Sequence, residues 1–196
     1  MSKPHSFLTA KIPLIFWQPQ FDLLCFILKK KAGSFKIVFL NYLIWFFLLF
    51  VCYLLINQQP SLFFSILIAM VISEIVERFG KQHALWRRPF FKRHQHTPPG
   101  LVESWYKTGS FPSGHTIKAV YFFILNLQFL VISPLVYLAV TLPLLIFRVL
   151  VGFHYPVDIL GGLIIGWGIW LFSSLFPSPE ILTNLIQIIF SFVFPQ

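Results

Sequence analysis

The chain has 196 residues, of which 57% are hydrophobic and only 11% are charged, and its mean hydropathy is +0.79. Soluble domains are about 45–50% apolar and about 25% charged, so this composition excludes an ordinary water-soluble globule and a disordered chain. In a soluble protein the net charge of +9 would indicate nucleic-acid binding. In so apolar a chain we instead expect a membrane protein with its charges outside the bilayer, and no nucleic-acid partner.

Five apolar segments are long enough to be expected to cross a bilayer, which takes about 20 residues of helix. In chain order they are 37–56, 61–80, 116–133, 135–151 and 157–176. The polar turn Asn57-Gln58-Gln59-Pro60 separates the first two, and Pro134 separates the third from the fourth. The predicted fold class is therefore all-α, a polytopic membrane helical bundle of about five to six transmembrane helices.

Two further segments are ambiguous. Residues 12–28 include Gln18, Pro19, Gln20 and Asp22, so an N-terminal helix lying in the membrane interface fits better than a sixth span. Residues 180–194 are apolar but short, which leaves a re-entrant, an interfacial or a thin spanning helix open. We expect a single domain over 1–196, with a motif-bearing core at 61–176 and an interfacial region at 1–36.

The number of spans decides which polar segments share a membrane face. If residues 29–36 lie on one face, the first span leaves it and the second returns to it, so residues 81–115 lie there too. The third and fourth spans repeat this, which brings residues 152–156 to the same face. We therefore expect two polar regions that are distant in sequence to meet.

Three polar motifs fall in or beside these two regions. They are Lys81-x6-Arg88-Pro89, Pro112-Ser113-Gly114-His115 and Arg148-x5-His154-x3-Asp158. Arginine forks match phosphate oxygens, and lysine adds a point charge. Ser113 and Gly114 precede the third span, where free N–H groups and the helix dipole attract anions, and the serine could also cap that helix. The set predicts an anion site for a group with several oxygens.

Two histidines in the same set allow a division of catalytic labour. A neutral imidazole can attack phosphorus while a second one protonates the leaving oxygen. With Pro156 in the first turn of the fifth helix, Asp158 could reach back to the ring of His154 and fix its tautomer. His94-x-His96 is a thin metal signal with no acidic or cysteine partner nearby, so we assign no metal and no cofactor.

The three motifs together resemble the signatures of the type 2 phosphatidic acid phosphatase (PAP2) superfamily. That superfamily also includes undecaprenyl-diphosphate phosphatases, glucose-6-phosphatase and vanadium haloperoxidases. The resemblance implies that His154 is the nucleophile that forms a phosphohistidine, Asp158 its orienting partner and His115 the general acid. It implies a phosphate cradle made of Lys81, Arg88, Ser113, Gly114 and Arg148.

The chain departs from the family pattern at Phe147, where the third signature usually has serine. The loss of one neutral donor costs on the order of 1–2 kcal/mol, so we expect altered affinity or rate. The expected function is hydrolysis of a phosphomonoester or diphosphate on a lipid, of the undecaprenyl diphosphate or phosphatidic acid type. A lipid-to-lipid phosphotransferase, a haloperoxidase-like use of the site and a non-catalytic lipid-phosphate binder remain open.

The membrane side follows from bases that belong to no motif. Lys29, Lys30, Lys31 and Lys36 lie on the same face as the motifs, whereas the short loops on the other face carry no base. Positively charged loops favour the cytoplasmic side. The sequence therefore predicts a multi-pass protein of the cell membrane, in contact with membrane lipids, whose site lies on the cytoplasmic face.

Overall fold

The structure is a computed structural model that describes residues 15–17, 31–83, 85–89 and 108–193. Within these ranges it contains six α-helices and no strand, apart from an isolated β-bridge between Arg87 and Gly109. The helices are α2 (Lys31–Gln58), α3 (Leu62–His83), α6 (Gly114–Phe129), α7 (Pro134–Leu150), α8 (Pro156–Ser173) and α9 (Glu180–Val193). The predicted all-α class is confirmed.

Turn chemistry explains where the helices end. After α2, the Gln59 amide still bonds to the Leu55 carbonyl at 2.8 Å, and α3 begins two residues after Pro60. The helix α6 ends four residues before the expected position because Leu130 has a left-handed φ of 52°. The Asn126 side chain then exchanges two 3.0 Å hydrogen bonds with the backbone of Ile132, which fixes the turn into α7.

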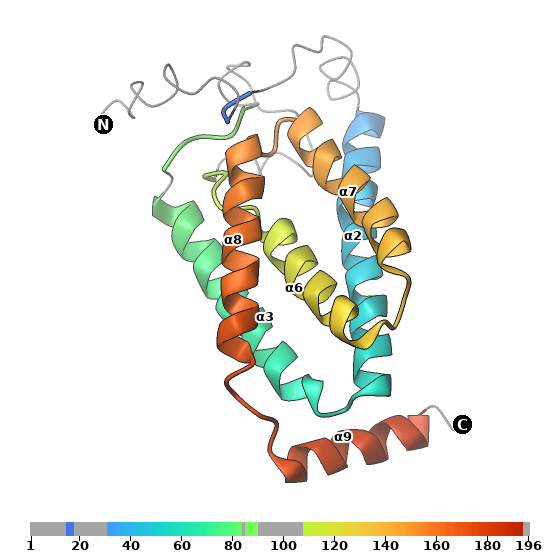
Figure 1. The fold of residues 1–196 in the computed structure, drawn as a ribbon. Coiled ribbons are helices and arrows are strands. Elements are labelled where there is room, and N and C mark those ends of the chain that lie inside the picture. The colour runs from blue at the N-terminus through green and yellow to red at the C-terminus, as the bar shows by residue number, and fades with distance from the viewer. Residues whose placement is uncertain (1–14, 18–30, 84, 90–107, 194–196) are drawn as a thin grey trace.

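The bundle is built around α6, which packs against α2, α3, α7 and α8 (Figure 1). Its closest partner is α8, because glycines on α8 let the two backbones approach. A Cβ added at Gly162 would lie 2.7 Å from Thr116 Cβ, and one at Gly166 would lie 2.6 Å from the Ile117 carbonyl oxygen. Small residues four apart are a common device for close helix contacts in membranes.

Among the described residues, two helices are long and apolar enough to cross a membrane, namely α2 over Ile37–Gln58 and α8. The outward faces of both are apolar, as at Phe46, Leu49 and Ile164, which are 68%, 62% and 71% exposed. Extended exposed apolar surface of this kind marks a contact surface, and the length of these helices suggests lipid as the partner. The helices α3, α6 and α7 form where three further spans are expected, but they are shorter or more charged, so the number of crossings stays a prediction.

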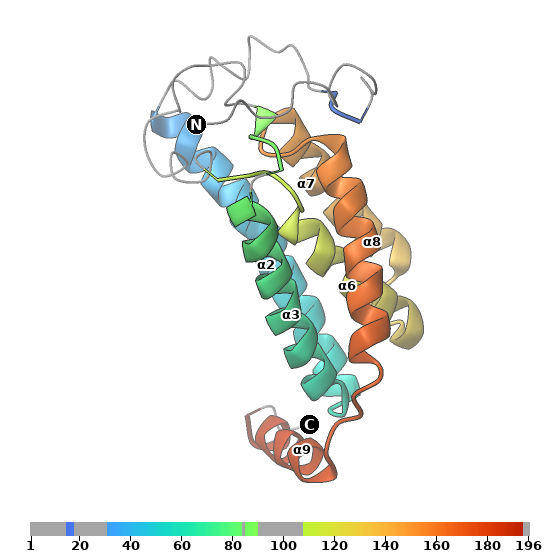
Figure 2. The same cartoon turned by 90° about the vertical axis from the view of Figure 1, so that its left-hand side faces the viewer.

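The last helix, α9, lies across one end of the bundle (Figures 1 and 2). It contacts α3, and its Phe190 ring stacks on Tyr53 of α2 at 5.9 Å. This orientation fits the interfacial alternative for residues 180–194 better than a span parallel to α8. The expected N-terminal interfacial helix lies outside the described residues, except that residues 15–17 form a turn.

Candidate active site

Four helix ends meet at the end of the bundle opposite α9. They are the end of α3, the start of α6, the end of α7 and the start of α8 (Figures 1 and 2). The three polar motifs are carried by these helix ends and by the segments next to them, including residues 85–89 after α3. Segments distant in sequence therefore meet at one end of the bundle, as the alternation of spans predicted.

The third motif is folded back on itself by a short turn between α7 and α8. Arg148 occupies the last turn of α7, where a cation is favoured by the helix dipole. Gly152 has a φ of 77°, a backbone conformation that glycine adopts without strain. The amide of Phe153 donates to the Arg148 carbonyl at 3.0 Å, as does that of His154 at 3.3 Å. The turn thus brings the backbone of His154 back beside that of Arg148.

Asp158 lies beside the His154 ring at the start of α8. Pro156 is the first helical residue, and the Asp158 Oδ2 atom accepts a 2.7 Å hydrogen bond from the Tyr155 amide. The same oxygen lies 3.4 Å from His154 Nδ1. This is ion-pair distance without hydrogen-bond alignment, and His154 Nδ1 has no hydrogen-bond partner among the described residues.

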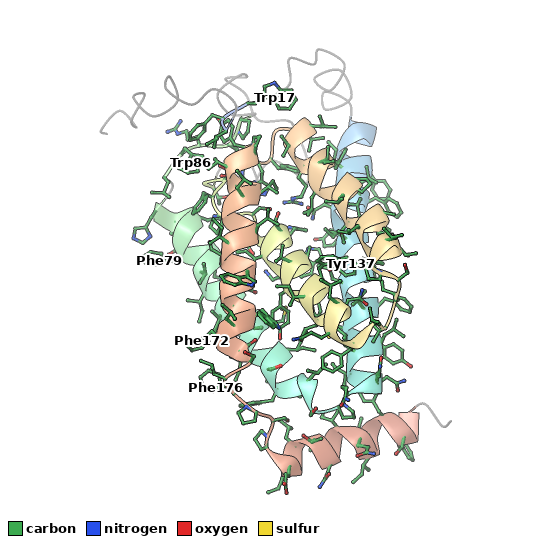
Figure 3. All side chains as sticks on the ribbon, viewed as in Figure 1. Trp17, Phe79, Trp86, Tyr137, Phe172 and Phe176 are labelled. Carbon is green, nitrogen blue, oxygen red and sulfur yellow. The ribbon has the colours of Figure 1, made fainter. Side chains whose placement is uncertain are left out.

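Trp86 is a partner of Asp158 that the sequence did not reveal. Its indole Nε1–H donates to the Asp158 Oδ1 atom at 2.9 Å. The ring packs edge-on against Phe111 at 5.3 Å, near the first turn of α8 (Figure 3). Its position two residues before Arg88 was the available signal.

Arg88 of the first motif is fixed to the loop that carries His154. It is 4% exposed, and its Nη1 donates to the Phe153 carbonyl at 2.9 Å. Its Nη2 donates to the Thr108 hydroxyl at 3.1 Å, a contact that no sequence motif indicated. Arg88 thus adds positive charge close to His154 and holds the preceding backbone in place.

Arg148 lies between the two histidines. Its Nη2 is 3.2 Å from His154 Nε2, and its Nη1 is 3.4 Å from His115 Nε2. All three side chains are at most 9% exposed. The two Nε2 atoms therefore face one planar guanidinium, so an oxyanion bound to that fork would lie near both rings.

The second motif starts α6. Ser113 occupies the N-cap position, but its side chain does not cap the helix, so that prediction was wrong. Its hydroxyl oxygen instead accepts from Thr116 at 2.9 Å, which leaves its own proton available to another acceptor. The Ser113 amide donates to the Asp158 carbonyl at 3.2 Å and so ties the second motif to the third.

A chain of alternating charges runs along the edge of this site. Lys81 lies in the last turn of α3, not in the loop where the sequence placed it, and it pairs with Glu77. The other oxygen of Glu77 accepts from Lys118 at 3.0 Å. Arg78 forms a second ion pair on the same helix, with Glu74 at 2.9 Å. The carboxylate of Glu77 fills the space where a Cβ on Gly114 would lie, so a larger residue there would displace Glu77 from its two lysine partners.

Burial and charge keep the His154 ring neutral. Burial lowers the pKa of its imidazole well below the ordinary value of 6.5, and nearby cations, first of all Arg148, lower it further. A neutral imidazole with a free lone pair is the nucleophilic form.

The described residues contain no cluster of three or more histidine, cysteine or acidic side chains that could hold a metal, and His94 and His96 lie outside them.

These helices and this buried, positively charged cluster define an all-α protein with a His–Arg–Asp site at one end of its bundle. A family model described as the PAP2 superfamily matches residues 61–181, more than half of the chain, so the chain belongs to this superfamily. Its members are generally phosphatases, which suggests activity on phosphate esters. The comparisons with curated proteins and with solved structures gave no match.

Proposed function

We propose that the protein is a membrane-embedded phosphatase that hydrolyses the phosphomonoester or diphosphate of a lipid through a phosphohistidine at His154. The observation that carries the proposal is the position of Arg148, within 3.2 and 3.4 Å of the Nε2 atoms of His154 and His115. A phosphoryl group bound to that guanidinium would have one imidazole on each of two sides. Such an arrangement suits in-line displacement, with one ring attacking and the other serving the leaving group.

The chemical steps follow from the assigned roles. The neutral His154 Nε2 attacks phosphorus, the bond to the leaving oxygen breaks, and His115, which takes up a proton as the anionic substrate binds beside it, gives that oxygen its proton. Water then attacks the phosphohistidine while His115 takes up a proton, and the P–N bond breaks to release inorganic phosphate. Asp158 stabilises the positive charge that develops on the His154 ring, as carboxylates do in catalytic triads.

The phosphate cradle of the proposal consists of Lys81, Arg88, Arg148, Ser113 and Gly114. The free proton of the Ser113 hydroxyl and the N-terminus of α6 are suitable donors to phosphate oxygens. Lys81 is held by Glu77 in the absence of substrate, so an incoming phosphate competes with that carboxylate for the ammonium group. The cradle contains only protein groups, and the proposal needs no cofactor.

A lipid substrate is supported by the setting of the site. It lies at the start of α8 and beside α2 at Asn41, and both helices are long and apolar enough to cross a membrane. A phosphate headgroup at the membrane surface could enter the site while its chains stay in the bilayer. Undecaprenyl diphosphate and phosphatidic acid represent the two lipid types proposed.

The test measures phosphate release from both lipids by purified protein in detergent micelles. His154→Ala should lose activity by about 10³-fold or more because it removes the nucleophile. His115→Ala should lose about 10²–10⁴-fold, the usual contribution of a general acid. His83→Ala is the matched control, since His83 is exposed on the last turn of α3 and should stay at wild-type activity.

Activity of His154→Ala close to that of wild type would contradict the mechanism. Addition of a second lipid separates hydrolysis from transfer, because a phosphotransferase would pass the phosphate to that lipid and release little inorganic phosphate. Binding of lipid phosphate without turnover in the wild-type protein would contradict the enzyme assignment.

A further inference from the structure

The helix α2 lies outside residues 61–181, yet one of its turns contacts the site. Asn41 is 9% exposed, and its Oδ1 atom accepts a hydrogen bond from Arg148 Nη1. That nitrogen is also the one that lies 3.4 Å from His115 Nε2. Asn41 thus contacts the guanidinium on the side that faces the second histidine.

A second residue of α2 contacts the same histidine. Trp45 lies four residues after Asn41 and therefore on the same face of the helix. Its ring meets the ring of His115 edge to face at 5.1 Å, and the Lys118 ammonium lies 5.1 Å from the centre of the Trp45 ring. One turn of α2 thus contacts Arg148, His115 and Lys118 together.

We infer that this turn of α2 belongs to the phosphoryl-transfer site, and that Asn41 is a positioning residue that holds Arg148 between the two histidines. The inference rests on the proposed function. A guanidinium is rigid and planar, so fixing Nη1 also fixes the direction of Nη2. The bond from Nη1 to Asn41 therefore sets the direction in which Nη2 points toward His154 Nε2, 3.2 Å away.

The cost of a polar side chain in α2 supports a specific role for Asn41. It lies within the stretch Ile37–Gln58 that could cross a membrane, where an unsatisfied amide would be unfavourable. Its neighbours Leu40, Tyr42 and Leu43 are apolar or aromatic. The amide lies where α2 contacts the Arg148 guanidinium.

The test compares two substitutions with a matched control on the same helix. Asn41→Leu keeps the approximate volume of the side chain but removes the acceptor for Arg148. Asn41→Asp keeps an acceptor and adds a negative charge beside the anion site. Asn57→Leu makes the same change at an exposed position near the other end of α2. The measurements are kcat, KM, the inhibition constant of inorganic phosphate, and Tm, all with the full chain in detergent micelles.

A positioning role predicts that Asn41→Leu lowers kcat about tenfold and weakens inhibition by inorganic phosphate about tenfold, because the guanidinium loses its fixed direction. Asn41→Asp should recover most of kcat but bind inorganic phosphate more weakly than wild type, because its carboxylate opposes the anion. Asn57→Leu should match wild type in kcat, KM and phosphate inhibition.

A merely structural role predicts a lower Tm with unchanged kcat and phosphate inhibition in every folded variant, and that result would overturn the inference. If Asn41→Leu does not fold, wild-type inhibition by inorganic phosphate in Asn41→Asp overturns it equally. A wild-type protein without turnover of any lipid phosphate contradicts the proposed function instead, so the two failures are distinguishable.

Discussion

At the scale of single residues, the buried charges explain one another. Arg148 and Arg88 are costly to bury, and each is held by acceptors from a different part of the chain. Asn41 on α2 and the Phe153 carbonyl after α7 are among those acceptors. The positive charge of the two arginines, together with burial, lowers the pKa of His154 and keeps its ring neutral. The fold thereby provides a neutral imidazole next to two cations.

The lowered pKa of His154 makes stability depend on pH. Below the ordinary pKa of about 6.5, the unfolded chain binds a proton on this ring and the folded protein does not, so the free energy of unfolding falls as pH falls. One such proton changes it by about 1.4 kcal/mol per pH unit. Charged groups around the ring are Asp158 from α8, Arg148 from α7, Arg88, Lys81 from α3 and His115 from α6.

The measurement is Tm at pH 7 and pH 5, followed by tryptophan fluorescence, for wild type and for His154→Gln. The variant lacks the titrating ring, so its Tm should fall less on acidification than that of wild type. An equal fall in both proteins would show that the His154 ring does not carry a lowered pKa.

Sequence reasoning identified the motif residues but not the residues that support them. The spacing in the third motif predicted that Asp158 would reach back to the His154 ring, and the two side chains lie 3.4 Å apart. Asn41 lies outside the motifs and Trp86 occupies an unspecified position of the first one, and their roles depend on contacts across 107 and 72 residues of sequence. A lone polar residue in an apolar span was the available signal for Asn41, because intramembrane polar groups are usually functional.

At the scale of helices, the contact between α6 and α8 determines how His115 stands relative to Asp158. Gly162 and Gly166 bring the two helix backbones together. The hydrogen bond from the Ser113 amide to the Asp158 carbonyl then fixes how far the two helices are shifted along their axes. Helix positions were predictable from the apolar runs and prolines. The close approach of these two helices was not, because it depends on which face of α8 its glycines occupy.

This contact predicts different effects for two glycines on one helix. Gly166→Ala would place a Cβ 2.6 Å from the Ile117 carbonyl oxygen and 3.0 Å from Val120 Cβ, so the helices must separate. We expect a loss of about 1–3 kcal/mol of stability and reduced phosphatase activity. Gly168→Ala meets no atom within 4 Å and should be neutral or slightly stabilising. Equal Tm values for the two variants would contradict the packing argument.

At the scale of the whole molecule, the site and α9 lie at opposite ends of the bundle (Figure 2). If the bundle spans the membrane, these ends face opposite sides. The bases outside the motifs favour the cytoplasm for the site end. We therefore expect α9 to lie along the outer surface, with its exposed Ile181, Ile188 and Phe192 in contact with lipid.

Cysteine labelling in intact cells tests this orientation. In a background with Cys25→Ser and Cys52→Ser, we would compare Gln82→Cys at the site end with Glu180→Cys at the start of α9. Both positions are exposed. An impermeant maleimide should label only position 180, and permeabilised cells should label both. Labelling of position 82 alone would reverse the orientation, and labelling of both in intact cells would contradict a spanning bundle.

The measurement that tests the central claim most directly is the capture of the phosphorylated protein. Wild type is mixed with a lipid phosphate labelled on phosphorus and quenched in alkali, in which phosphohistidine survives, and the labelled residue is located by mass spectrometry. The account predicts label on His154, and no label in His154→Ala. Label on any other residue, or turnover by wild type with no covalent label at any quench time, would contradict it.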